Sequence, residues 1–262
     1  MLEFIFDIPL VIAGLAIVGF LSLFAIGGLL LVRRRVLPHL RIHDEDAHFS
    51  AAMVHSVMVF YGLALALIAV HVFETYADVS KIISQEATAL AVLYRDVSTY
   101  PEPIRHQLQK EVRDYVDYVI HEAWPLQQHG QMPTGDVERM NHFQDTLVTF
   151  EPNTGGQKVL HGETLRAYNN MIQARRLRLD AVDTGLPGLM WMVILGGAFI
   201  SLSASFFFKV DDARLHGILV TLLATFLGMV IFMTLALDRP FRGDLGVRPG
   251  PYQLIYDHLM KP

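Results

Sequence analysis

Four apolar runs, each long enough to cross a lipid bilayer, constrain the fold of this chain more than any other feature. They cover residues 9–32, 51–73, 186–208 and 215–237, and none contains Asp, Glu, Lys or Arg. A run of about 20 apolar residues matches a hydrocarbon core of roughly 30 Å. Because lipid offers the backbone no hydrogen-bond partners, each run should form a helix that satisfies its own amides. The sequence therefore predicts an integral membrane protein with the lipid bilayer as its surroundings.

The polar residues are concentrated between the second and third runs. Residues 75–185 contain 15 acidic and 11 basic side chains, and the whole chain of 262 residues has a formal net charge of −5. A strongly basic surface is absent, which argues against nucleic acid as a partner. The chain has no Cys, which excludes disulfides, thiolate catalysis and Cys-ligated metals.

The order of charges at the N-terminus differs from that of a cleavable signal peptide. Glu3 and Asp7 precede the first apolar run, and three consecutive arginines, Arg33 to Arg35, follow it. A signal peptide has its basic residues before the apolar stretch and a small-residue cleavage site after it. We therefore expect the first helix to be retained, with its N-terminus outside.

Basic residues in the short loops predict the orientation, because such residues favour the cytoplasmic side. The loop at residues 33–50 contains four arginines, and the loop at residues 209–214 contains Lys209 and Arg214. Both loops are expected in the cytoplasm, with the N-terminus, residues 75–185 and the C-terminus outside. The bases of the C-terminal segment argue for the opposite orientation; they are Arg239, Arg242, Arg248 and Lys261.

The polar block is predicted to be helical, because its apolar residues recur at helical spacing and show no strand-like alternation. One long helix is expected from about residue 51 to 98, followed by helices over about 104–124, 136–150 and 154–183. Thr154 and Gln157 fit a capping box at the start of the last of these. The predicted class is all-α. Its parts are two transmembrane helices (1–74), an extramembrane helical bundle (75–185), two further transmembrane helices (186–238) and a C-terminal tail (239–262).

Several short motifs, taken in sequence order, resemble one family. They are residues 41–49 (RIHDEDAHF), 72–76 (VFETY), 86–95 (EATALAVLYR), Tyr118 with 122–125 (EAWP), 174–179 (ARRLRL), Leu186-Pro187 with Trp191, and 237–243 (LDRPFRG). Over nearly the whole chain this set resembles the bacterial four-helix membrane proteins with a bestrophin-like domain of unknown function. The family often has Trp where this chain has Phe73.

The resemblance implies a protein of the bacterial inner membrane with a remote kinship to bestrophins, which are pentameric anion channels. It thereby implies a homo-oligomer as the assembly and an inorganic ion as a possible partner. No segment of the chain matches a bestrophin gate or calcium-clasp motif, so no site residue is carried over from that kinship.

One candidate site lies at the outer end of the second apolar run. His71 and Glu74 are three residues apart and therefore share a helix face. Ser56 precedes them on that face, and Asp78 follows. Ionisable groups near membrane depth usually face protein or water, so several copies of the chain could form a polar ring or an ion site at a pore mouth. Alternatively, Glu74 lies among the lipid headgroups and pairs with an arginine.

A second candidate is Asp238, which follows the fourth apolar run. It could contribute to a charged ring, since such rings set the ion preference of channels. Alternatively it belongs to a structural corner in which an arginine neutralises Asp238 or Glu74. The arginines expected on the same side are Arg175, Arg176, Arg178, Arg239 and Arg242.

The segment 39–48 contains three His and three acidic residues. Its spacing matches no metal signature such as H-E-x-x-H, and a solvated turn next to the membrane is expected instead. The chain also lacks the nucleophile, phosphate-binding and dinucleotide-binding fingerprints. We therefore expect no metal, no cofactor and no enzymatic activity.

Two classes of function remain. The first is a homo-oligomeric bestrophin-like channel or pore, which explains the four spans, the polar groups and the lack of catalytic motifs. The second is a non-conducting sensor, assembly or accessory protein whose helical bundle binds a partner. Glu74 and Asp238 favour cations, whereas the resemblance favours anions, so the sign of the ion stays open.

Overall fold

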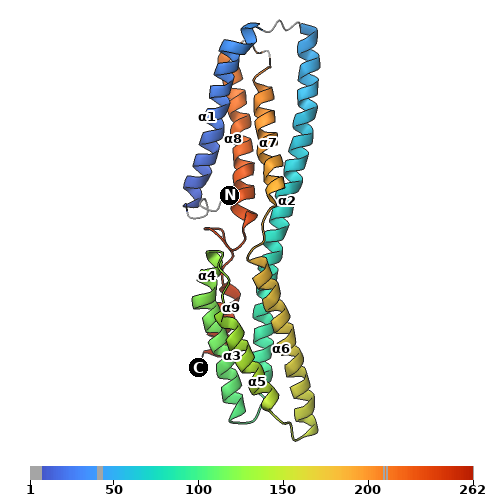
Figure 1. The fold of residues 1–262 in the computed structure, drawn as a ribbon, viewed down its shortest axis with the longest axis vertical. Helices are drawn as coiled ribbons and strands as arrows, with labels where there is room; N and C mark the ends of the chain where they lie inside the picture. Colours follow the sequence, from blue (N-terminus) through green and yellow to red (C-terminus); the bar gives the residue numbers. More distant parts are fainter. Residues whose placement is uncertain (1–7, 40–43, 209, 211, 262) are drawn as a thin grey trace. The chain divides into compact units, whose positions relative to one another are not determined.

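The computed structural model describes residues 8–39, 44–208, 210 and 212–261, without the side chains of residues 44–50. Every element in these ranges is helical (Figure 1), which confirms the predicted all-α class. Four of the described segments are long and apolar enough to cross a membrane: Leu10–His39, Ala51–Val97, Gly188–Ser205 and Ala213–Asp238. They contain most of the four apolar runs, so the chain is an integral membrane protein.

The chain divides into two compact units. The membrane unit comprises Met1–Glu74 and Gly185–Asp238, and the bundle unit comprises Thr75–Thr184 and Arg239–Pro262. One boundary between the units falls inside the long helix α2 (Asp44–Val97). The predicted continuous helix from about residue 51 to 98 is confirmed, and α2 begins seven residues earlier than expected.

The membrane unit contains α1 (Leu10–Leu31), the first part of α2, α7 (Gly188–Ser205) and α8 (Ala213–Asp238). A π-helical segment, Val32–Val36, and a 3-10 turn, Leu37–His39, extend α1. Large apolar side chains such as those of Leu15 and Leu23 are exposed on this unit. Such a surface is stable only in an apolar solvent, which the bilayer provides.

Helices α1 and α8 pack side by side along their lengths (Figure 1). A Cβ on Gly228 of α8 would lie 3.1 Å from the Cα of Val18 on α1. Glycine at this position therefore lets the two backbones approach closely, as small residues do in membrane helix pairs. A hydrogen bond of 3.3 Å between the hydroxyls of Ser22 and Thr225 joins the same two helices.

The bundle unit is built around the second part of α2. Its other elements are α3 (Ile104–Tyr118), the π-helix η4 (Val119–Ala123), α4 (Trp124–Gln128), α5 (Gly135–Thr149), α6 (Gly155–Ala181), α9 (Gly250–Ile255) and the π-helix η5 (Tyr256–Met260). The apolar stripe of α2 is buried in its core and comprises Val79, Ile83, Ala87, Leu90, Leu93 and Val97. The regularly spaced Leu108, Val112 and Tyr115 of α3 lie in the same core, as expected from their helical spacing.

The predicted capping box at the start of α6 is confirmed. The amide of Gln157 donates to Oγ1 of Thr154 (3.2 Å), and the amide of Thr154 donates to Oε1 of Gln157 (3.2 Å). These two bonds satisfy amides that the first helical turn leaves without partners. Helix α6 then runs from Gly155 to Ala181, close to the predicted range.

The helix that begins at Ile104 extends farther than predicted. Its backbone stays helical through η4 and α4 to Gln128, although an end near Trp124 and Pro125 was expected. A proline inside a helix lacks an N–H and clashes with the carbonyl four residues earlier. Here a wider π-helical turn precedes Pro125, which occupies one of the first positions of α4, where a missing N–H is tolerated.

The C-terminal segment, predicted only as a tail, contributes to the core of the bundle unit. The side chains of Tyr252 and Met260 are almost fully buried. The rings of Trp124 and Tyr252 lie with their centroids 5.6 Å apart in an edge-on arrangement. The indole N–H of Trp124 also donates to the carbonyl of Val247 (3.2 Å). The segment after α8 therefore returns to the bundle and anchors there.

Candidate functional site

The polar residues predicted at the second apolar run lie on one exposed face of α2. Ser56, His71, Glu74 and Asp78, called the α2 stripe from this point, are all exposed. The opposite face of the helix is buried; it includes Leu65, Val72, Val79 and Ile83. Within one chain, α2 is therefore covered on one side and exposed on the side of these polar groups, where Phe60 and Leu67 are also exposed.

The α2 stripe has a defined charge pattern along the helix. The spacing of three and four residues between His71, Glu74 and Asp78 places them one above the other. Lys81 continues the stripe three residues later and is also exposed. One chain thus presents two carboxylates, one ammonium group and an imidazole within about three helical turns. Ion-binding and pore-lining surfaces have this type of composition.

Asp238 lies elsewhere, in a buried corner of the membrane unit. Its side chain accepts a hydrogen bond from the amide of Leu186 (2.6 Å) and one from the indole N–H of Trp191 (3.3 Å). The residue is only 7% exposed. These bonds tie the end of α8 to the start of α7 and hold the Asp238 carboxylate where it is largely shielded from solvent in one chain.

The five predicted pairing arginines take separate positions in the bundle unit. Arg175 pairs with Asp136 (2.8 Å), Arg178 with Glu86 (2.7 Å) and Arg239 with Asp183 (3.4 Å). Arg176 is exposed. The guanidinium of Arg242 packs against Gly130, which has a positive φ of 70°. The ion pairs of Arg175, Arg178 and Arg239 thus involve acids of the bundle unit.

The pair of Arg178 and Glu86 belongs to a buried polar cluster that sequence reasoning missed. The guanidinium contacts both carboxylate oxygens, at 2.7 Å and 3.3 Å, and the hydroxyl of Tyr115 donates to the same carboxylate (2.9 Å). Tyr252 of α9 completes the cluster, with its ring centroid 6.0 Å from the guanidinium carbon. All four side chains are fully buried. The signal in the sequence was Glu86, which interrupts the apolar stripe of α2.

The electrostatics of this cluster favour the charged pair and neutral tyrosines. Burial raises the pKa of Tyr115 and of Tyr252 well above the ordinary value, and the carboxylate of Glu86 raises both further. Burial alone would lower the pKa of Arg178, but the Glu86 carboxylate holds it well above its usual range. The cluster therefore combines an ion pair with two neutral tyrosines and joins α2, α3, α6 and α9.

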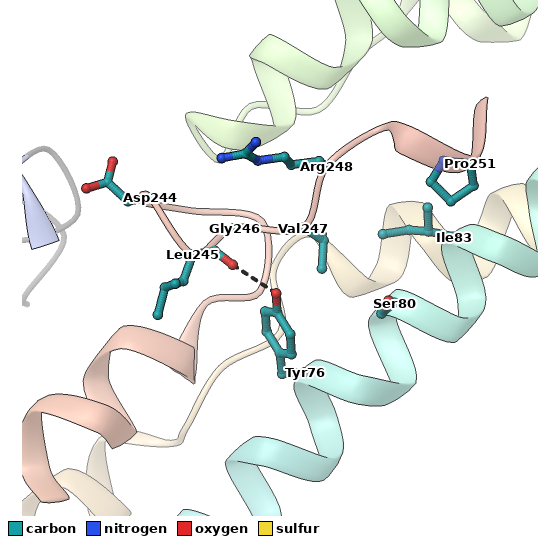
Figure 2. A pocket seen from close by; sticks show the side chains of 9 residues that line it. All are labelled: Tyr76, Ser80, Ile83, Asp244, Leu245, Gly246, Val247, Arg248 and Pro251. Atoms are coloured by element: carbon teal, nitrogen blue, oxygen red, sulfur yellow. Dashed lines mark hydrogen bonds between the residues drawn. The ribbon is translucent and has the colours of Figure 1, made fainter. Parts of the chain in front are cut away.

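A pocket of about 330 Å³ lies within the bundle unit between α2 and the C-terminal loop (Figure 2). Tyr76, Ser80 and Ile83 form the α2 wall, and residues 244–248 with Pro251 form the other wall. The hydroxyl of Tyr76 donates to the carbonyl of Leu245 (2.9 Å) and so holds the two walls together.

No group of three or more potential metal ligands occurs among the described residues. Most of the segment 39–48 lies outside the described residues, since neither residues 40–43 nor the side chains of residues 44–48 are described. His39 is described; its Nδ1 lies 2.8 Å from the carbonyl of Arg35.

Comparison with known proteins identifies one family. The model of the Bestrophin-like domain matches residues 19–252, which is most of the chain and includes both units. No curated protein and no solved structure matches the chain. The match over these residues and the four apolar helices agree, and the chain belongs to the Bestrophin-like domain family.

Proposed function

We propose that this protein forms a homo-oligomeric channel in which copies of α2 surround a central pore. The observation that carries the proposal is the α2 stripe, which lies on a face that its own chain leaves open. His71 and the adjoining Glu74 sit at the end of an apolar run, where contact with lipid is costly for ionisable groups. Copies arranged about an axis would turn these groups away from lipid and toward water.

The charges of the α2 stripe do not by themselves determine whether the pore would conduct cations or anions. Glu74 and Asp78 favour cations, because acidic rings do so in cation channels. Lys81, three residues further on, offsets one of these charges, and Asp238 is already engaged in the corner of the membrane unit. We therefore propose a pore without assigning its ion preference, which a flux measurement would determine.

The test is ion flux through the purified protein in liposomes, with K⁺ and Cl⁻ gradients run in parallel. Flux above that of empty liposomes supports the channel, and the gradient that responds gives the sign of the ion. Glu74→Gln should change the flux by about fivefold, the equivalent of roughly 1 kcal/mol of Coulomb energy at 4 Å in water. Glu138→Gln removes a charge from another exposed position, on α5, and serves as the matched control. Absence of flux from folded, inserted protein would contradict the proposal.

A second candidate function is a non-conducting sensor or accessory protein. The pocket between α2 and the C-terminal loop favours it, since a preformed recess of this size suits a small ligand. This alternative predicts no flux in either gradient, together with a ligand or partner that binds the bundle unit.

A further inference from the structure

The pocket of the bundle unit lies on the side of α2 away from the α2 stripe. Ile83, on its α2 wall, is buried, whereas Asp78 and Lys81 are exposed on the other side of the helix. A role for the pocket is therefore independent of whether the α2 stripe lines a pore.

The C-terminal wall of the pocket is held rigidly. The amide of Val247 donates to the carbonyl of Pro240 (2.8 Å), and the amide of Gly246 donates to the carbonyl of Gly243 (3.0 Å). A Cβ on Gly246 would lie 2.8 Å from the carbonyl oxygen of Phe241. Only glycine therefore fits this tight turn. Together with the Tyr76–Leu245 bond, these contacts preform the pocket, which reduces the ordering cost of binding.

Two charged residues of opposite sign, Arg248 and Asp244, line the pocket. The side chain of Arg248 extends back along the loop (Figure 2), and no ion pair of this guanidinium is found in the part of the chain that the structure describes. The carboxylate of Asp244, also on the loop, points away from the Tyr76 hydroxyl in the same view. Ser80 adds a hydroxyl on the α2 wall. A guanidinium and a hydroxyl in the lining of one pocket suit an anion with several oxygens, such as a phosphate ester.

The pocket residues follow the apolar segments closely in the sequence. Tyr76 is three residues beyond Phe73, where the second apolar run ends, and Asp244 is six residues beyond Asp238, where α8 ends. At no more than about 3.6 Å per residue, Tyr76 lies within roughly 11 Å of Phe73. Leu245 leaves an apolar side chain 43% exposed on the loop. Lipid headgroups at the membrane surface could supply phosphate groups to residues that follow a membrane span this closely in the sequence.

We propose that the pocket formed by Tyr76, Ser80 and the loop at residues 244–248 binds the phosphate group of a phosphate ester, with Arg248 as the anion-binding residue. The phosphate belongs either to a lipid headgroup or to a soluble phosphate. The apolar wall side chains, Ile83 and Val247, contact the organic part of the ligand.

The experiment measures binding to the full-length, delipidated protein in a neutral detergent by native mass spectrometry and calorimetry. The probes are short-chain phosphatidylglycerol, short-chain phosphatidylcholine and inorganic phosphate. We expect saturable binding at one site per chain. Binding of the lipids alone assigns the site to a headgroup, whereas competition by inorganic phosphate at similar concentration assigns it to a soluble phosphate.

Three variants make the test specific. Arg248→Gln should weaken binding about ten- to a hundredfold, the range for one hydrogen-bonded charge. Ser80→Phe fills the pocket from an exposed position of α2 and should weaken binding without changing the charge. Arg176→Gln removes one positive charge from the exposed side of α6 and should leave the affinity within about twofold, because exposed charges there lie outside the pocket.

Two results would overturn the proposal. One is the absence of saturable binding for all three probes. The other is equal weakening by Arg248→Gln and Arg176→Gln, which would mean nonspecific attraction to the whole bundle unit. Because the readout is binding in detergent and not flux, either result leaves the channel proposal to its own test.

Discussion

The fully buried pair of Glu86 and Arg178 places two opposite charges in the core of the bundle unit. Two charges removed from water are tolerated only when they are paired and hydrogen-bonded. Tyr115 supplies the additional bond to the carboxylate. The four elements that contribute side chains, among them the C-terminal α9, are thereby held in one arrangement, which suggests that the cluster determines how the bundle unit closes.

Glu86→Gln should destabilise the bundle unit by about 3–5 kcal/mol, because the guanidinium of Arg178 would remain buried without its counter-charge. Thermal unfolding of the purified protein, followed by circular dichroism, measures the effect. The control is Glu163→Gln, whose partner Arg166 lies 2.8 Å away on the exposed side of α6; that change should cost less than about 1 kcal/mol. Equal effects of the two variants would mean that the buried cluster adds no stability.

The two tyrosines of the buried cluster predict that the protein loses stability at alkaline pH. Their pKa values are raised in the folded protein, so neutral Tyr115 and Tyr252 stabilise it fully below about pH 10, the ordinary pKa of tyrosine. This contribution is lost as the pH rises through the higher folded values, because the unfolded chain then releases the protons more readily. The unfolding temperature should fall from pH 8 to pH 11.

Tyr115→Phe isolates this effect from other groups that titrate in the same range. At pH 8 the variant should be less stable by about 1 kcal/mol, since it loses the hydrogen bond to Glu86. Its further loss of stability toward pH 11 should be smaller than that of the unaltered protein. The same alkaline loss in both proteins would exclude Tyr115 as a contributor.

At the scale of helices, the sequence predicted what one-dimensional patterns can determine. The membrane helices were predictable from the length of the apolar runs, because the thickness of the bilayer determines the length of a span. The bundle helices were predictable from the helical spacing of residues such as Val79 and Ile83. The packing of residues 239–261 into the bundle could not be predicted from the sequence. Their few apolar residues form no periodic pattern, and their contact with Trp124 appears only in the folded structure. The partner of Glu86 was equally hidden, since Arg178 is 92 residues away in the chain.

The position of the α2 stripe on one helix face predicts which residues of α2 are accessible from a pore. In this Cys-free chain, Asp78→Cys should react with a charged thiol reagent, and the reaction should reduce ion flux severalfold if α2 lines the pore, because the added bulk and charge stand in the ion path. Gln173→Cys lies on the exposed side of α6 and should react without changing the flux. Labelling of Asp78→Cys with unchanged flux would remove α2 from the pore.

The whole molecule has an asymmetry that bears on its orientation. Within the membrane unit, a guanidinium nitrogen of Arg33 donates to the carbonyl of Val210 (3.1 Å), so the loops after α1 and α7 meet at one end of that unit. The basic residues of both loops therefore act on the same side of the membrane. This contact strengthens the expectation that these loops are cytoplasmic, although the basic residues of the segment 239–261 favour the opposite orientation.

Single cysteines test this orientation directly. Gln128→Cys, at the exposed end of α4, should react with an impermeant thiol reagent added to right-side-out membrane vesicles. Pro38→Cys, in the loop after α1, is also exposed but should react only after the vesicles are opened, because its loop is expected in the cytoplasm. Mass spectrometry of the labelled protein gives the extent of each reaction. The reverse pattern would place the bundle unit in the cytoplasm, and the phosphate pocket would then face the cytoplasmic leaflet, where anionic lipids create a negative surface potential.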